Sequence, residues 1–392
     1  MTSPQGVSMS SNSVTATRLT SIDALRGTVI LIMLLDHVRD TFYLHRQLAD
    51  PVDLDQVEPG LFVSRVLAHL CAPVFVLLTG LSAWLYGSRQ SDPRKATSLF
   101  LFKRGLFLIV LEMTVVNIGW NFQVPPTVFY LQVIWAIGVS MLALSLLLWL
   151  PRAALAAVAV VIIAGHNLLD GITATDGTAF HVLWAILHDR SWFELGGIPV
   201  RSSYPVLPWI GIIALGYVLG PWFGRDTTPA QRRRRLVRAG WSMLAAFVAL
   251  RVINVYGDAP WQHDADALTA VMSFFNLTKY PPSLLFVLFT VGIGLLLLRA
   301  YEAPGVARML TPVIDFGAAP MFFYVLHLYV LKLMYLAAVA AFGTNHGRYY
   351  GMDSVGMLWL TAAMLVLVLY LPTRAFARLK ARRRDLAWLR YF

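Results

Sequence analysis

Cysteine and charged residues are both scarce in this sequence. A single cysteine, Cys71, cannot form an intramolecular disulfide or a cysteine-based metal cluster, which excludes disulfide scaffolds and cysteine-ligated metal proteins. Cysteine-based redox chemistry is also not expected. Charged residues make up only 14% of the 392 residues, whereas hydrophobic residues make up 58%. This composition is far from that of a soluble globular protein and indicates an integral membrane protein.

Long apolar segments recur along the chain, separated by charged or Pro/Gly-rich breaks. Each has about the 20 residues needed to cross the hydrocarbon core of a bilayer. We therefore expect an all-α polytopic membrane bundle of about ten transmembrane helices, which form one domain over residues 18–376. A disordered tail (1–17) and a basic tail (377–392) would flank this domain. The expected spans are 22–44, 61–87, 98–118, 127–150, 152–170, 204–223, 236–256, 281–300, 313–342 and 355–376.

The basic residues give a net charge of +11, but their distribution does not suggest a nucleic-acid-binding protein. They collect in short loops between the expected spans, as the positive-inside rule describes for membrane proteins. Residues 1–17 lack a basic n-region and the first apolar segment lacks a small-residue cleavage site, so this span is expected to be retained. Both termini are then predicted to be cytoplasmic. Only a few Lys and Arg residues of the connecting segments fall on the outer side: Arg46, Arg190, Arg201, Lys279 and Arg348.

Histidine is distributed unevenly across this predicted topology. None of the nine histidines lies in a cytoplasmic loop, and most lie in outer loops or in the outer halves of spans. Imidazole is suited to proton transfer near neutral pH, whereas guanidinium and ammonium groups are suited to binding phosphate. The chain therefore separates phosphate-binding residue types on the inner side from proton-transfer types on the outer side.

The first expected span contains several ionisable side chains, although such groups are costly at membrane depth. Helical periodicity places Arg26 and His37 on nearly the same face, roughly 16 Å apart along the axis. In a structural interpretation, Arg26 pairs with Asp23 and reaches the inner headgroups, while His37 is a satisfied interior polar group. In a functional interpretation, Asp36 or Asp40 orients the His37 imidazole, because the first adjoins it and the second follows about one turn later.

Other spans hold further candidate residues. Lys103 and Arg104 begin the third span near the inner surface, where they can bind phosphates or anchor lipid headgroups. His166 and Asp170 end the fifth span four residues apart, a spacing typical of a His-carboxylate pair and compatible with two ligands of a metal site. No second pair accompanies them at matching spacing, so no metal is expected, and a capping or interfacial role is the alternative.

The ninth span also contains a polar pair. His327 lies one turn after Tyr324 in an otherwise apolar segment. Such a pair is consistent either with a polar pathway through the bundle or with a simple interhelical hydrogen bond.

Several segments, in their order and spacing, resemble the heparan-α-glucosaminide N-acetyltransferase-like catalytic-domain family of bacterial membrane proteins. The resemblance covers nearly the whole chain, roughly residues 18–342. The ten residues between Arg26 and His37 are also similar to the motif at the start of the integral-membrane acyltransferases that O-acetylate surface polysaccharides. The segments are RLTSIDALRGTVILIMLLDHVRD, APVFVLLTGLSAWLYG, GHNLLDG, YPVLPWIGIIALGYVLGPWFG, KYPPSL and FGAAPMFFYVLHLYV.

The resemblance implies an acyltransferase in the bacterial cytoplasmic membrane. Its donor would be cytosolic acetyl-CoA or another acyl-CoA, and its acceptor a hydroxyl or amine of an envelope glycan or lipid-linked sugar on the far side. The donor phosphates would lie near Arg26, Lys103 and Arg104, and the thioester would meet a histidine near the outer side. Membrane lipids are the other expected partners; nucleic acid is not expected, and the oligomeric state is left open.

We expect His37 to be the general base, oriented by Asp36 or Asp40. His45 and His166 are the alternates, and His45 matches the later position of the catalytic histidine in lysosomal members of the family. The competing hypothesis is a proton-coupled transporter, because Asp, His and Arg side chains inside the membrane can also form a proton relay.

Overall fold

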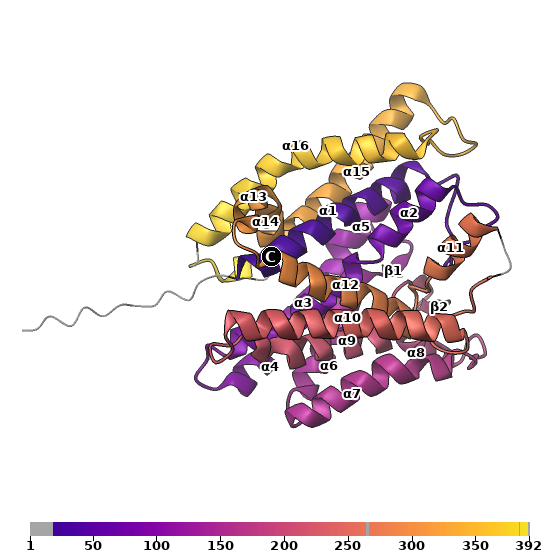
Figure 1. Ribbon diagram of the computed structural model, residues 1–392. Coiled ribbons are helices and arrows are strands. Elements are labelled where there is room, and N and C mark those ends of the chain that lie inside the picture. Colours follow the sequence, from indigo (N-terminus) through magenta and orange to yellow (C-terminus); the bar gives the residue numbers. More distant parts are fainter. Residues whose placement is uncertain (1–18, 264–265, 384, 391–392) are drawn as a thin grey trace, which may run out of the picture.

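The computed structural model describes residues 19–263, 266–383 and 385–390, and the expected tail over 1–17 lies outside these residues. The chain is mostly helical, with long helices packed side by side (Figure 1). Within the described ranges, six helical segments are long and apolar enough to cross a membrane. They are Pro59–Gly87 (α2, Pro59–Ala68, with α3, Cys71–Gly87), Arg152–Leu169 (α7, Arg152–Gly165, with a 3-10 turn), Pro229–Ile253 (α10), Leu284–Tyr301 (α12), Pro320–Phe342 (α15) and Val355–Arg382 (α16).

The other expected spans coincide with helices that are shorter or more highly charged. The helix α1 (Thr20–Phe42) is long but carries ionisable residues near both ends, and α4 (Pro93–Leu111) is basic in its first half. The helices α6 (Val133–Leu147) and α9 (Leu207–Leu219) are apolar but short. Helix length and composition therefore do not confirm the predicted count of about ten spans. They do confirm a mostly helical protein with apolar helices of membrane-spanning length.

Short elements connect these helices. A π-helical turn, Glu112–Val116, joins α4 to α5 (Asn117–Asn121), and 3-10 turns cover His166–Leu169, Gly220–Phe223 and Ala387–Arg390. The remaining short helices are α8 (Ala179–Leu187), α11 (Ala267–Phe275), α13 (Val306–Met309) and α14 (Thr311–Ala318).

Capping side chains explain where several long helices begin. Thr228 forms a capping box with Gln231 at the start of α10, and Pro229 occupies the first helical position, where a missing N–H costs nothing. Ser283 accepts a hydrogen bond from the backbone N–H of Phe286 at the start of α12. Ser354 accepts one from the backbone N–H of Met357 at the start of α16. These caps satisfy N–H groups that have no partner within the helix.

A small sheet, which the sequence did not lead us to expect, lies among the connecting segments. Its strands are β1 (Phe129–Leu131), β2 (Trp192–Leu195) and β3 (Ile198–Ser202), in the order β1-β3-β2. The strands β2 and β3 form an antiparallel hairpin through Gly196 and Gly197, both of which have positive φ, and β3 pairs with β1 in parallel. The strands are too short to show a clear alternation of polar and apolar residues, and the sheet leads directly into Tyr204.

The helix α1 runs through the middle of the bundle, with α15 and α16 on one side and α3 and α12 on the other (Figure 1). It also packs closely against α14. A Cβ at Gly27 would lie 1.8 Å from the carbonyl oxygen of Val313, and a Cβ at Gly317 would lie 1.8 Å from the carbonyl oxygen of Asp23. Only glycine allows the two backbones to approach this closely, which is typical of helix contacts in membranes.

The ninth expected span, 313–342, is broken in the structure. The helix α14 ends at Ala318 and α15 begins at Pro320, with Ala319 in a non-helical conformation between them. A proline favours this break because it cannot donate a backbone hydrogen bond and restricts the preceding residue. The break places Gly317, Ala318 and Pro320 in the wall of a cavity beside α1.

The close contact between α1 and α14 predicts that Gly27→Ala destabilises the protein. The added methyl group would push the two backbones apart, and overpacking of this kind costs about 1 to 3 kcal/mol. We expect a lower midpoint of thermal unfolding for the full chain in detergent. Gly60→Ala is the matched control, because a Cβ at Gly60 would meet its nearest neighbour at 3.5 Å, an ordinary contact distance. Equal midpoints for the two variants would contradict the packing argument.

Candidate functional site

A cavity of about 340 Å³, called the main cavity below, lies beside α1. Four positions of α1 that repeat at helical spacing face it: Arg26, Ile30, Met33 and His37. The wall is mostly apolar, with polar side chains near Arg26 and near His37. The other lining residues are Asp36, Ala68, Cys71, Ala72, Phe75, Thr79, Ser82, Ala83, Tyr86, Phe100, Arg104, Leu108, Val133, Ile134, Ile137, Met141, Tyr204, Lys279, Gly317, Ala318, Pro320, Met321, Tyr324 and Lys380.

Cations from three helices line the main cavity around the first half of α1. The Arg26 guanidinium donates to Asp23 Oδ1 at 3.1 Å and to the Ser82 hydroxyl on α3. Lys380 of α16 lies 3.4 Å from the carbonyl oxygen of Ala318, close to the contact between α14 and α1. Arg104 of α4 adds a third positive charge to the same wall. Guanidinium and ammonium groups are the side chains suited to binding anionic groups.

A second cavity, of about 260 Å³ and called the polar cavity below, adjoins the second half of α1. It shares Asp36, His37 and Tyr204 with the main cavity, so these three side chains belong to both walls. Its other lining residues are Arg39, Asp40, Tyr43, Leu44, Gln47, Leu48, Arg65, Trp120, Gln132, Arg190, Ser203 and Tyr280. His37 is therefore within reach of ligands in either cavity.

His37 pairs with a second histidine, His327 of α15. The His37 Nδ1 atom lies 2.6 Å from His327 Nε2, and His327 Nδ1 lies 2.8 Å from the carbonyl oxygen of Phe323. A carbonyl can only accept, so His327 Nδ1 carries the proton and the neutral ring accepts at Nε2. His37 Nδ1 is then the donor, which leaves the lone pair of His37 on Nε2. That atom forms no hydrogen bond with the described residues.

The carboxylates next to His37 bind cations and not the imidazole. Asp36 Oδ1 accepts from Arg39 Nε at 3.0 Å and from Nη2 at 2.8 Å. Its Oδ2 lies 3.8 Å from Arg65 Nη1 and 3.7 Å from Lys279 Nζ. Asp40 pairs with Arg39 at 2.7 Å.

The expectation that Asp36 or Asp40 orients His37 therefore needs correction, since in the described part of the chain neither carboxylate hydrogen bonds to it. Successive helical residues point about 100° apart, so Asp36 turns away from its neighbour toward Arg65 and Lys279. The partner that fixes the imidazole comes from another helix.

Asp50, in the loop between α1 and α2, fastens the segment that carries Lys279. Its carboxylate accepts from the backbone N–H groups of Lys279 at 3.1 Å and Tyr280 at 2.8 Å, and from Arg65 Nη2 at 3.3 Å. The side chain is only 2% exposed. Burial raises the pKa of Asp50, while the positive charges of Arg65 and Lys279 oppose that rise. One buried carboxylate thus positions two cations of the site.

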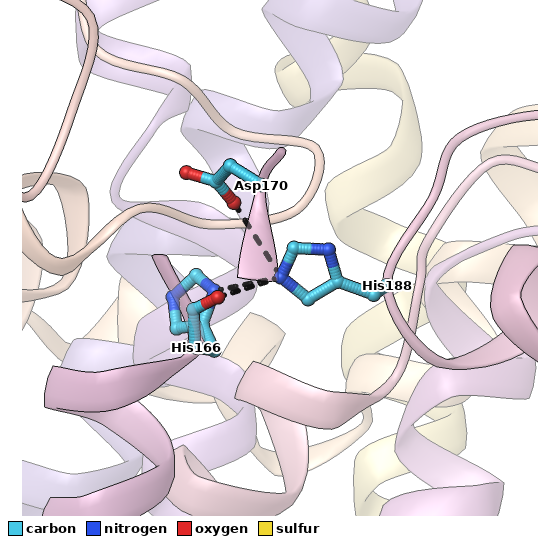
Figure 2. A group of neighbouring side chains, drawn as sticks. All are labelled: His166, Asp170 and His188. Atoms are coloured by element: carbon cyan, nitrogen blue, oxygen red, sulfur yellow. Dashed lines mark hydrogen bonds and ion pairs between the residues drawn. The ribbon is translucent and has the colours of Figure 1, made fainter. Parts of the chain in front are cut away.

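The remaining candidate residues lie elsewhere. Lys103 is exposed, and only its neighbour Arg104 lines the main cavity. His45 stacks on His346 with ring centroids 3.8 Å apart, and burial together with that second imidazole lowers the pKa of His45. His166 contacts His188, which in turn pairs with Asp170 (Figure 2). Neither His45 nor His166 is among the residues that line the two cavities.

A comparison with known families gives a match over more than half of the chain. The family model for heparan-alpha-glucosaminide N-acetyltransferase, catalytic, matches residues 18–256. The chain belongs to this family. No curated protein matches the chain. Membership implies an acyltransferase of the transmembrane acetyltransferase type, in agreement with the apolar helices, and gives no support to the transporter alternative.

Three residues of the site in this heparan-alpha-glucosaminide N-acetyltransferase family member were not identified as site residues from the sequence. Arg65 stands inside an apolar run, and an arginine at that depth requires a partner, so a signal was present. Lys279 was noted only as one of the few basic residues on the outer side, although it begins the KYPPSL segment. His327 was considered for a polar pathway, but no spacing in the sequence relates it to His37. These contacts are long-range and arise only in the folded chain.

The hydrogen bonds and ion pairs of the buried Asp50 carboxylate predict that Asp50→Asn destabilises the protein more than a typical surface substitution does. The change removes one charge from a buried group that faces Arg65, and disruption of a buried ion pair costs about 3 to 5 kcal/mol. The midpoint of thermal unfolding in detergent should fall by several degrees. Asp53→Asn, an exposed change in the same loop, is the control and should leave the midpoint unchanged. A stable Asp50→Asn protein would show that the carboxylate charge is not needed.

Proposed function

We propose that the protein transfers an acyl group, in particular acetyl, from cytosolic acyl-CoA to an acceptor on the other side of the membrane. The acceptor is a hydroxyl or amine of an envelope glycan or a lipid-linked sugar. One observation carries this proposal: His37 lines both the main cavity, whose wall contains cationic side chains, and the polar cavity. A donor in the first and an acceptor in the second would meet at one imidazole.

The main cavity suits the donor. Arg26, Arg104 and Lys380 supply positive charge for the phosphates of CoA, and Ile30 and Met33 offer an apolar surface to its pantetheine arm. The distance from Arg26 to His37 along α1 is roughly 16 Å, comparable to the reach of that arm. The thioester carbonyl would then lie near His37. Lys103 is exposed and does not line this cavity, so the proposed donor-binding residues do not include it.

The tautomer of His37 suits a general base. Its Nε2 lone pair accepts the proton of the acceptor O–H or N–H as the acceptor atom attacks the thioester carbonyl carbon. The carbon–sulfur bond then breaks, and the CoA thiolate takes the proton from the His37 imidazolium and leaves as the free thiol, which restores the neutral base. The Lys279 ammonium, which lines the main cavity, can stabilise the oxyanion that forms during the attack. His327 acts as a positioning residue, because it holds the His37 ring and its tautomer.

The positive-inside distribution supports the orientation that this reaction needs. We propose that both termini are cytoplasmic, that the Arg26 end of α1 faces the cytoplasm, and that about ten helical segments cross the bacterial cytoplasmic membrane. The charged α1 and the short helices α6 and α9 would be spans that the rest of the bundle shields from lipid. Several of their residues are fully buried, including Leu25, Leu34 and Trp209.

Replacement of the proposed base tests the function directly. We expect His37→Ala to lower the rate of thiol release from acetyl-CoA, with glucosamine as the acceptor probe, by about 100-fold or more. The affinity for acetyl-CoA, measured by calorimetry, should stay the same. His45→Ala is the control and should keep the rate, because His45 lines neither cavity. A rate that survives in His37→Ala and is lost in His45→Ala would move the base to His45, and no acetyl-CoA binding by the wild type would reject the acyltransferase.

Replacement of the proposed donor ligand tests the other end of the main cavity. Arg26→Gln should weaken acetyl-CoA binding about tenfold or more, because a hydrogen bond to a charged group contributes about 1.5 to 3 kcal/mol. The expected effect is on KM, with little change in kcat. Lys103→Gln is the matched control, since Lys103 is a nearby cation that lines neither cavity. Equal weakening by both changes would mean that the donor binds through general surface charge.

A further inference from the structure

A group of three potential metal ligands lies away from both cavities. His166 comes from the 3-10 turn after α7, Asp170 follows that turn, and His188 ends α8. Figure 2 shows the His188 ring pointing at both other residues. One ligand atom from each residue lies within 4.8 Å of the other two. The two histidines are buried, whereas the Asp170 side chain is 51% exposed, so an ion has access from outside.

Hydrogen bonds cannot satisfy all the polar atoms of His166, Asp170 and His188 at once. Three polar atoms surround His188 Nε2: the backbone oxygen of His166 at 2.9 Å, His166 Nδ1 at 3.4 Å and Asp170 Oδ1 at 3.5 Å. One ring nitrogen carries at most one hydrogen, so it cannot donate to all of them. A cation at the centre would satisfy both imidazole nitrogens and the carboxylate together.

Two of the three separations between ligand atoms fit a tetrahedral ion. Bonds of about 2.0 to 2.1 Å to nitrogen and oxygen place the ligands of a tetrahedral Zn²⁺ about 3.3 Å apart. The two measured separations from His188 Nε2, 3.4 Å to His166 Nδ1 and 3.5 Å to Asp170 Oδ1, match that edge length. His188 would release its hydrogen bond to the His166 backbone oxygen when it coordinates the ion.

Neighbouring side chains hold the ligands in place. Asn167 Nδ2 donates to Asp170 Oδ2 at 2.9 Å, which leaves Oδ1 directed at His188, and Asn167 Oδ1 accepts from the backbone N–H of Leu284 at 2.9 Å. Trp184 stacks on the His188 ring with centroids 5.0 Å apart. Such outer partners orient the ligands of metal sites.

We propose that His166, Asp170 and His188 bind a divalent transition metal ion of the Zn²⁺ class. Two imidazoles and one carboxylate suit such an ion better than Mg²⁺ or Ca²⁺, which prefer oxygen ligands alone. In the sequence, His166 and Asp170 are compatible with two ligands of a metal site, but no metal is expected because no second pair has matching spacing. The third ligand comes from α8 and shares no motif spacing with them. This proposal does not depend on the proposed acyl transfer.

The ion would act as a structural clamp near the polar cavity. It would join the end of α7 to the end of α8, and Arg190 follows His188 by two residues. Arg190 lines the polar cavity, and its guanidinium lies 4.7 Å from the centre of the Tyr280 ring. A fixed His188 therefore helps to fix this part of the polar wall.

Metal binding by the full chain in detergent tests the proposal. The protein, purified with a tag that contains no histidine and treated with a chelator, is titrated with Co²⁺ and then with Zn²⁺. We expect one ion per chain, a visible Co²⁺ spectrum typical of tetrahedral coordination, its loss on addition of Zn²⁺, and a higher midpoint of thermal unfolding with Zn²⁺. No binding by the wild-type protein would overturn the proposal.

Three variants locate the ion. Asp170→Asn changes an exposed side chain and should fold, and His188→Gln can still donate a hydrogen bond to the His166 backbone oxygen. Both should weaken Zn²⁺ binding at least about tenfold and remove the thermal shift. His346→Gln is the matched control, because His346 also lies beside a carboxylate, Asp353 at 3.1 Å, and belongs to no such group of three among the described residues. Unchanged binding in Asp170→Asn and His188→Gln would overturn the assignment.

Discussion

The structure depends on how α1 buries its charges. Asp36 lies at the centre of the bundle and is shared by Arg39, Lys279 and Arg65, which come from three different segments of the chain. A buried carboxylate without such partners would be far more costly inside a membrane protein than in water. The network therefore joins α1, α2 and the segment before α12 into one unit. The second carboxylate, Asp50, extends it by holding the backbone of Lys279 and Tyr280. The position of Lys279 in the cavity wall is a consequence of these two acids.

The same network explains the environment of His37. Asp36 and Asp40 bind guanidinium groups, and among the described residues neither hydrogen bonds to the neighbouring imidazole. His37 pairs instead with His327, whose own proton is committed to the Phe323 carbonyl. A neutral partner fixes the tautomer without adding a negative charge to an already crowded site. The charged pairs and the proton-accepting nitrogen of His37 thus line the same cavities but have separate hydrogen-bond partners.

Periodicity was enough to predict some of this arrangement, but not all of it. Arg26 and His37 were expected on one face of a helix, and both line the main cavity. Local spacing could not identify the partner of His37, because His327 lies 290 residues away. The same limit applies to His188, which joins His166 and Asp170 through a separate helix. The small sheet was missed because strands of three to five residues carry no readable pattern. Properties of one helix were predictable, whereas contacts between helices were not.

The family match covers only part of the residues that form the site. The matched region, residues 18–256, contains Arg26, Asp36, His37 and Arg65, but it ends before Lys279, His327 and Lys380. Each of these three lines the main cavity or contacts a residue that does. The matched region therefore provides the charged face of α1, and the segment beyond it provides the partner of His37 and part of the cavity wall. The site is therefore complete only when the segment beyond residue 256, which includes Lys279, His327 and Lys380, packs against the matched region.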